Sequence, residues 1–187
     1  MLVAVVPPPE VVADLDEFLE PRRHAGAFRW TLAEQFHITL ALCAQVPERS
    51  LDDLGERLQR AAGRRSRFEA QLAGGGAFPH AVGARLLWVG LGADADGTTE
   101  LERLATGARA AISKAGIAVG GDRFGPHLTV ARLKRPQEVS NWVRLFDAYA
   151  GPQWTVDEVT LVESHLGQGP RKRPRHEVVA RYALSHA

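Results

Sequence analysis

The chain has 187 residues, 45% of them hydrophobic and 24% charged, which is ordinary composition for a folded protein and argues against long disordered segments. Its formal net charge of +1 argues against a surface coated in basic charge for indiscriminate DNA binding, so any contact with nucleic acid should be local. Cys43 is the single cysteine, which excludes an internal disulfide and a metal site built from several cysteines. The first residues lack a basic region and a long apolar run, so we expect a cytoplasmic protein without a membrane span.

Strand and helix patterns alternate through the first part of the chain. Residues 2–6 form a short apolar strand pattern that three prolines end, and apolar residues recur at helical spacing over residues 11–19. A second strand is expected at residues 36–43. Ser50 precedes another apolar stripe at helical spacing, and Asp53 follows three residues later as in a capping box. We therefore expect a capped helix that begins after Ser50.

Glycines divide the middle of the chain. Residues 68–72 and 85–91 are expected to be two strands, joined by a turn at the glycine run 74–76. That run could also cradle a phosphate, but phosphate loops usually lead straight into a helix carrying Lys and Ser or Thr, and this run does not. Apolar residues at helical spacing over 101–112 predict a helix that Gly116 ends with a left-handed cap.

The last part of the chain predicts a strand at residues 128–133, a helix that Pro136 opens, and strands at residues 155–163 and 176–184. The loop at residues 171–175 holds four basic residues among five, so it could follow an RNA backbone or could simply be a solvated charged loop. The hairpin signals and the final strand pair favour antiparallel pairing over a doubly wound parallel sheet. The expected fold class is therefore α+β.

A four-residue pattern, His-x-Thr-x, begins at His37 and returns at His127, about half the chain later. In a strand, period-two alternation sends the histidine and the threonine of each copy to one face. An imidazole exchanges protons near neutral pH, and the hydroxyl of Thr39 or Thr129 can donate a hydrogen bond to an anionic oxygen. Two copies brought together would supply an acid, a base and two anion-binding donors.

A single copy of this pattern would prove little, because a strand histidine is more often a structural residue and threonine is favoured in strands. The contexts of the two copies match, however. Phe36 stands directly before His37, residues 124–126 (Phe-Gly-Pro) stand before His127, and each copy continues into an apolar strand. The recurrence favours catalysis, and its spacing indicates two similar lobes that each give one motif strand to a shared cleft.

The residues around both motifs resemble the two-histidine (2H) phosphoesterases, and in particular the bacterial and archaeal RNA 2′,3′-cyclic phosphodiesterases, also called 2′-5′ RNA ligases. The resemblance covers nearly the whole chain, since Trp30 ahead of the first motif and residues 74–79, 85–88, 124–132 and 163–169 also look similar. It implies a bilobal, pseudo-twofold α+β fold in which two antiparallel sheets line a central cleft and the helices lie outside. Residues 1–187 would form a single domain of two interleaved lobes, with one motif in each.

The resemblance also implies hydrolysis of an RNA or nucleoside 2′,3′-cyclic phosphate, with a 2′-phosphate as the favoured product and 2′-5′ ligation as the reverse reaction. His127 would activate water and His37 would protonate the departing ribose oxygen. Thr39 and Thr129 would donate hydrogen bonds to the phosphate, and Arg132 could reach it or could be a solvated or ion-paired side chain. No metal ion or cofactor is required by this scheme.

Phe124 could stack on a nucleobase, with core packing as the alternative. The partner would be an RNA end, a short 2′-5′ linked oligonucleotide or a small cyclic phosphate, and a monomer is expected. Some positions depart from the family: Gly125 stands where many members have a basic residue, His176 stands where tyrosine is common, and residues 44–46 replace a Leu-Gly turn. The histidines outside the motifs are interpreted as surface or structural residues: His24, His80, His165, His176 and His186.

Two other functions fit parts of this pattern. A binding module could keep the fold and hold an RNA end or a cyclic nucleotide without turning it over, although two intact motifs argue against it. A zinc site could use His37, His127 and a third histidine, but neither motif contains a carboxylate or a second histidine at ligand spacing.

Overall fold

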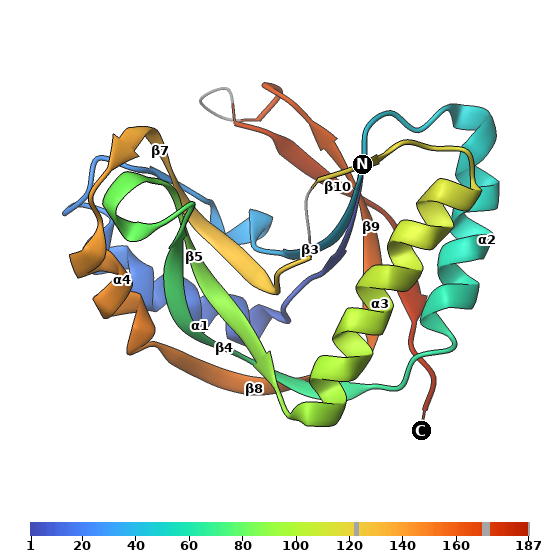
Figure 1. Cartoon of the computed structure of the whole chain (residues 1–187), viewed down its shortest axis with the longest axis horizontal. Helices are drawn as coiled ribbons and strands as arrows, with labels where there is room; N and C mark the ends of the chain where they lie inside the picture. Colours follow the sequence, from blue (N-terminus) through green and yellow to red (C-terminus); the bar gives the residue numbers. More distant parts are fainter. Residues whose placement is uncertain (122–123, 170–172, 187) are drawn as a thin grey trace.

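The computed structural model describes residues 1–121, 124–169 and 173–186, and Figure 1 shows the arrangement of their helices and strands. The helices are α1 (Pro9–Leu19), α2 (Leu51–Ala62), α3 (Ala95–Lys114) and α4 (Ser140–Asp147). The strands are β1 (Leu2–Val5), β2 (Arg29–Trp30), β3 (Ile38–Cys43), β4 (Phe68–Phe78), β5 (Ala84–Ala93), β6 (Val119–Gly120), β7 (His127–Gln137), β8 (Ala150–Val156), β9 (Glu158–His165) and β10 (Arg175–Ala183). The α+β class expected from the sequence is confirmed.

All ten strands belong to one antiparallel sheet, with the main order β10-β9-β1-β3-β7-β5-β4-β8. The expectation of two separate sheets is wrong, because β3 and β7 pair with each other at Ile38 and Leu128 and so join the two halves. The pairing pattern is the same on both sides of that junction. On one side, β3 pairs with β1 and with the short strand β6. On the other side, β7 pairs in the same way with β5 and with the short strand β2.

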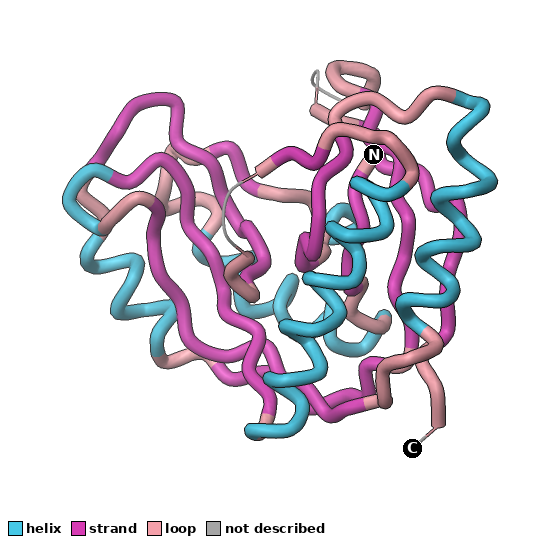
Figure 2. Tube along the Cα trace, turned by 45° about the vertical axis from the view of Figure 1, so that its right-hand side comes forward, coloured by secondary structure: helices cyan, strands magenta, loops and turns pink. Residues whose placement is uncertain are grey.

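The helices form two groups, one for each half of the sheet (Figure 1). Helix α3 packs against α2 and β3, whereas α4 packs on β4 and α1 packs on β8. The strands curl between these groups, as Figure 2 shows. The alternate side chains that face the helices are fully buried, including Ile38 and Leu128 at the junction. Within the described residues, no helix is both long and apolar enough to cross a membrane.

Several elements lie where the sequence predicts them. The strands at residues 2–6 and 36–43, the helix at residues 11–19 and the last strand are all present within a few residues. Helix α3 ends as expected, because Gly116 has a φ of 75° and the amide of Ile117 reaches back to the carbonyl of Ile112 at 3.2 Å. The helix after Ser50 also forms.

The capping box expected at Ser50 is absent. Residues Glu48–Ser50 form a one-turn 3₁₀ helix that leads directly into α2. Ser50 therefore has helical backbone angles, with φ −96° and ψ −6°, and its side chain makes no capping hydrogen bond. A serine caps a helix from an extended backbone, which this preceding turn excludes.

The turn expected at the glycine run is also wrong, because residues 74–76 lie inside the long strand β4. Gly74 has a φ of 68° and stands at a bulge in the pairing with β5. A side chain at Gly75 would stand 2.3 Å from Cβ of Phe146, and one at Gly76 would stand 2.2 Å from the indole of Trp88. The run therefore serves a bulge and close packing, and the chain reverses later, around Ala81–Gly83.

Two boundaries in the last part of the chain also differ from the sequence prediction. Pro136 lies near the end of β7, and α4 begins only at Ser140. A proline is tolerated there because it lacks only one backbone donor, at a strand end. The strand expected at residues 155–163 is two strands, β8 and β9, with Asp157 between them.

Candidate active site

The junction between β3 and β7 brings the two motifs together. Because Ile38 is paired with Leu128 in an antiparallel register, the residues on either side of each face their counterparts across the junction. His37 is thereby opposite Thr129, and Thr39 is opposite His127. Ile38 and Leu128 point into the core, so alternation places all four polar motif side chains on the other side of the sheet, here called the motif face.

Both imidazoles are held by the same local contact. Nδ1 of His37 lies 2.7 Å from the carbonyl oxygen of Gln35, and Nδ1 of His127 lies 2.7 Å from that of Gly125. A carbonyl oxygen only accepts a hydrogen bond, so each Nδ1 carries a proton. In a neutral ring this leaves the Nε2 lone pair free to take a proton from a substrate or a water.

A bulge follows each motif and sets which later residue joins the motif face. In β7, Thr129 pairs with Trp88 but Ala131 pairs with Leu87, so Val130 is an extra residue. Because of this extra residue, the side chain of Arg132 lies on the same face of the sheet as that of Thr129. In β3, Leu40 is the extra residue, and Leu42 takes the equivalent position. Of these two equivalent positions, only the one on the second half carries an arginine.

His37 is the more enclosed of the two motif histidines. Its ring centroid lies 5.1 Å from that of His176 on β10, at an interplanar angle of 71°. Burial lowers the pKa of His37 to about 4, although the bond to the Gln35 carbonyl opposes this shift, and the positive charges of His176, Arg132 and His127 lower the pKa further. At neutral pH His37 is thus uncharged in the free protein.

His127 is exposed, and it stands opposite Gly90 on β5. The ring of Trp88 lies 6.0 Å from its ring, measured between centroids. Trp88 in turn covers Gly76, where any larger residue would displace the indole. The second motif thus has an aromatic neighbour and open access to solvent.

The arrangement can hold a phosphoryl group. Residues related diagonally on one face of an antiparallel pair lie about 7–8 Å apart, which leaves room for a tetrahedral phosphate between His37 and His127. The two threonine hydroxyls lie on the other diagonal of the same square. Two proton-transfer groups and two neutral donors therefore surround one point, with Arg132 beside them.

Other sequence candidates lie elsewhere. Phe124 is half-buried, packs against the core and lines a pocket together with Leu101 and Pro126, and its stacking on a nucleobase stays a prediction. Two members of the basic loop, Arg171 and Lys172, lie outside the described residues. His176 and Trp88 were not among the residues predicted for the site. His176 was interpreted from the sequence as a surface or structural residue. The departure from the family tyrosine was the available signal for His176.

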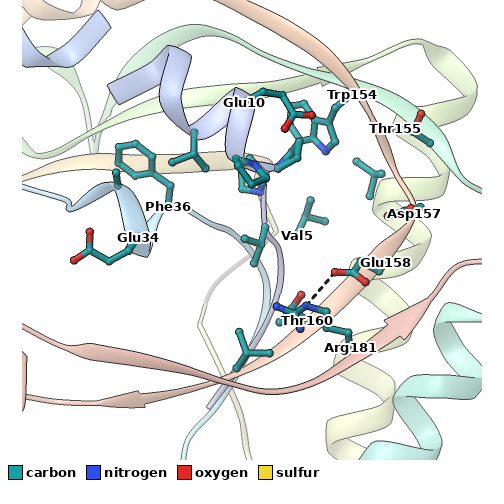
Figure 3. Close-up of a pocket in the computed structure, with 18 of the residues that line it drawn as sticks. Val5, Glu10, Glu34, Phe36, Trp154, Thr155, Asp157, Glu158, Thr160 and Arg181 are labelled. Carbon is teal, nitrogen blue, oxygen red and sulfur yellow. Dashed lines mark ion pairs between the residues drawn. The ribbon is translucent and has the colours of Figure 1, made fainter. Parts of the chain in front are cut away.

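One cavity is separate from the motif side chains. It has a volume of about 750 Å³, and Figure 3 shows that β1, the start of α1, β8 and β9 surround it. Neither a motif histidine nor a motif threonine lines it. Among the described residues no group of three or more His, Cys, Asp or Glu side chains is arranged to hold a metal ion.

Comparison with known proteins agrees with this geometry. Residues 7–168 match the 2′-5′ RNA ligase superfamily. An RNA 2′,3′-cyclic phosphodiesterase of Aeropyrum pernix is 35% identical over 152 residues, which are 79% of this chain and 83% of that protein. Another of that name, from Archaeoglobus fulgidus, is 33% identical over 134 residues, covering 71% of this chain and 72% of the relative.

Solved structures give the same result for the fold. A Thermus thermophilus protein, TT0787, matches with a TM-score of 0.78 and 28% identity, over 99% of this chain and 97% of that one. Escherichia coli LigT in complex with 3′-AMP matches with a TM-score of 0.77 over the same shares, and at 22% identity it supports the fold alone. The fold and the paired motifs define a 2H phosphoesterase. The chain belongs to the 2′-5′ RNA ligase superfamily, which confirms the resemblance seen in the sequence.

Proposed function

We propose that this chain is a metal-independent phosphodiesterase that hydrolyses RNA or nucleoside 2′,3′-cyclic phosphates to a phosphomonoester, with the 2′-phosphate favoured. The observation that carries the proposal is the junction of β3 and β7, where both His-x-Thr pairs share one face and both imidazoles are held through Nδ1. The relatives named RNA 2′,3′-cyclic phosphodiesterases support the substrate class.

The reaction needs a base for water on one side of the phosphorus and an acid for the departing oxygen on the other. In our assignment Nε2 of His127, which is exposed, removes a proton from the water as the new P–O bond forms. Nε2 of His37 gives a proton to the ribose O3′ as the P–O3′ bond breaks, and a 2′-phosphate is released. In 2′-5′ ligation a 5′-hydroxyl takes the place of water, so His127 removes its proton and His37 again protonates O3′; in the reverse reaction, cleavage of the 2′-5′ bond, the two histidines exchange roles.

His37 must gain a proton before it can act as the acid, because its pKa of about 4 keeps it neutral in the free protein at pH 7. A bound phosphate anion favours the imidazolium and raises that pKa. Protonation of His37 is thereby coupled to substrate binding. Thr39, Thr129 and Arg132 stabilise the charge that grows on the phosphoryl oxygens.

The expected partner is an RNA end or a small cyclic-phosphate nucleotide. Escherichia coli LigT was solved with 3′-AMP and also with phosphate, which agrees with a nucleotide site in this fold. The chain is expected to act as a monomer, because both motifs of the site come from one chain.

The test is an assay of the wild-type protein on 2′,3′-cyclic nucleotides and on RNA with a cyclic phosphate end, with product identification by ³¹P NMR. Hydrolysis to the 2′-monoester that is insensitive to chelators, and is lost in His37→Ala and His127→Ala, supports the proposal. His24→Ala is the matched control, because this exposed histidine lies outside both motifs. Tight binding of a cyclic phosphate without product would instead indicate a binding module.

A further inference from the structure

A third histidine reaches the motif face from the other end of the sheet. His176 lies on β10, where it pairs with Ser164 of β9. Its half-buried ring stands edge-on to His37, with 5.1 Å between ring centroids. The motifs themselves do not predict this contact, because β10 is separated from β3 by two strands in the sheet order.

The carboxylates of the β9–β10 hairpin point away from this contact. Strand alternation turns Glu163 and Glu177 to the opposite face from His176. There, both lie within 3.6 Å of Nε2 of His165, and Glu177 also lies 3.5 Å from Arg175. The acidic groups of the hairpin are thus already paired with basic side chains on its far face.

The charged groups that act on His37 are basic. Besides His176 they are His127 and Arg132, both on β7, and each lowers the pKa of His37. Within the described part of the chain, the contact of His176 is the ring of His37, and no hydrogen bond to the His176 imidazole is found. A half-buried imidazole beside a residue whose charged neighbours are all basic stands where an anion is favoured.

Gln35 fixes the position of both rings. Its backbone carbonyl accepts the hydrogen bond from Nδ1 of His37 at 2.7 Å. Its side-chain amide donates to the carbonyl of Pro174, at the start of the strand that carries His176. One residue therefore ties the first motif to the hairpin, so the contact between the two imidazoles is built into the fold.

We propose that His176 is a third anion-binding residue of this site and that its imidazole donates a hydrogen bond to the phosphoryl group held beside His37. The identity of the anion as a phosphoryl group rests on the proposed function. A tyrosine at this position, as is common in the family, would donate one hydrogen bond without any charge. Histidine adds a positive charge once it is protonated, so this chain should bind phosphate more tightly as the pH falls.

The direction of that pH dependence follows from the surroundings. Burial lowers the pKa of His176 in the free protein, so its ring is mainly neutral at pH 7. A phosphate anion beside it favours the protonated form, and each bound anion therefore takes up protons at mildly acid pH.

The direct test is calorimetric binding of inorganic phosphate, adenosine 2′-monophosphate and a slowly reacting cyclic-phosphate analogue at pH 5.5 and 8.0. His176→Phe keeps a ring but removes both nitrogens, and should weaken binding of the monoester about tenfold at pH 5.5, the size expected for a lost hydrogen bond to a charged group. The loss at pH 8.0 should be smaller. His176→Gln keeps a neutral donor, so it should recover part of the affinity and should show a weaker pH dependence than the wild type, because His37 still takes up a proton on binding.

His165→Phe is the matched control, since it makes the same change on the same hairpin but on the opposite face. Equal binding by wild type and His176→Phe at pH 5.5, or an equal loss in His165→Phe, would overturn the inference. A second readout is kinetic. Lost ground-state binding raises KM and leaves kcat nearly unchanged, whereas a fall in kcat alone would assign His176 to support of the His37 ring.

These outcomes separate the inference from the proposed function. If the wild type binds phosphate through His176 but hydrolyses no cyclic phosphate, the proposed function fails and the anion site stands. If hydrolysis proceeds and binding ignores His176, the proposed function stands and this inference fails.

Discussion

The two halves of the sheet present the same motif in different surroundings. Each histidine bonds through Nδ1 to the carbonyl two residues earlier, and each strand bulges after its threonine. His37, however, is enclosed beside His176, whereas His127 is exposed beside Trp88. The repeated frame fixes the tautomer and direction of the imidazoles, and the neighbouring strands make their surroundings unequal, since burial lowers the pKa of His37 to about 4.

The largest expected effect tests whether both halves serve one reaction. His37→Ala and His127→Ala should each reduce the rate on a 2′,3′-cyclic nucleotide by about a hundredfold to ten-thousandfold. The double variant should lose little more than the worse single variant, because groups that act as a unit are not additive. Single-turnover rates measure this. Losses that multiply in the double variant would mean that the two halves act independently.

The next effect tests the threonines as an equivalent pair. Thr39→Val and Thr129→Val remove a hydroxyl at nearly constant volume, and each should reduce kcat by about a hundredfold or more if it stabilises charge in the transition state. Serine at either position should recover much of the rate, because it restores the donor. A normal rate for one valine variant would show that the phosphate contacts only one half.

The sequence predicts the motif pair well because alternation in a strand is local and strong. Period two alone sends His37 and Thr39 to one face, and the same holds for His127 and Thr129. The residues that lie next to the motifs in space, but far from them in the chain, cannot be predicted in this way. The approach of His176 to His37 depends on how the β9–β10 hairpin bends and on the hydrogen bond from Gln35 to Pro174, which joins residues far apart in the chain.

The wrong sequence predictions share one physical cause. The glycine run at residues 74–76 has the composition of a turn, but its glycines are needed where Phe146 and Trp88 approach the strand. Ser50 has the spacing of a cap, but the preceding 3₁₀ turn takes away its extended backbone. In the same way, only the bulge at Val130 shows that Arg132 returns to the motif face. Local rules fail where tertiary packing determines the backbone.

A smaller effect tests the arginine that follows the second motif and has no counterpart after the first. Arg132→Leu gives the second half the residue that the first half has at Leu42. We expect KM for a cyclic phosphate to rise about tenfold, with a smaller change in kcat, because a hydrogen bond to a charged group is lost. Arg132→Lys keeps the charge, so its KM should lie between that of the wild type and that of Arg132→Leu. Steady-state kinetics would contradict the assignment if Arg132→Leu left KM unchanged.

The smallest effect is a shift in the pH profile, which measures how far burial lowers the pKa of His37. The pH dependence of kcat/KM reports the free enzyme, in which burial lowers the pKa of His37 to about 4. Since the active form holds one proton on the pair of histidines, activity is lost on acidification when a second proton binds, so the acid limb should lie near pH 4, well below the ordinary histidine value of about 6.5. In the kcat profile the same limb should lie higher, because bound phosphate favours the imidazolium.

Arg132→Leu removes one of the positive charges that hold this pKa down, so it should move the acid limb of kcat/KM upward by less than one pH unit. A downward shift would contradict the electrostatic account. An acid limb near pH 6.5 in the wild type would show that His37 is not enclosed in solution.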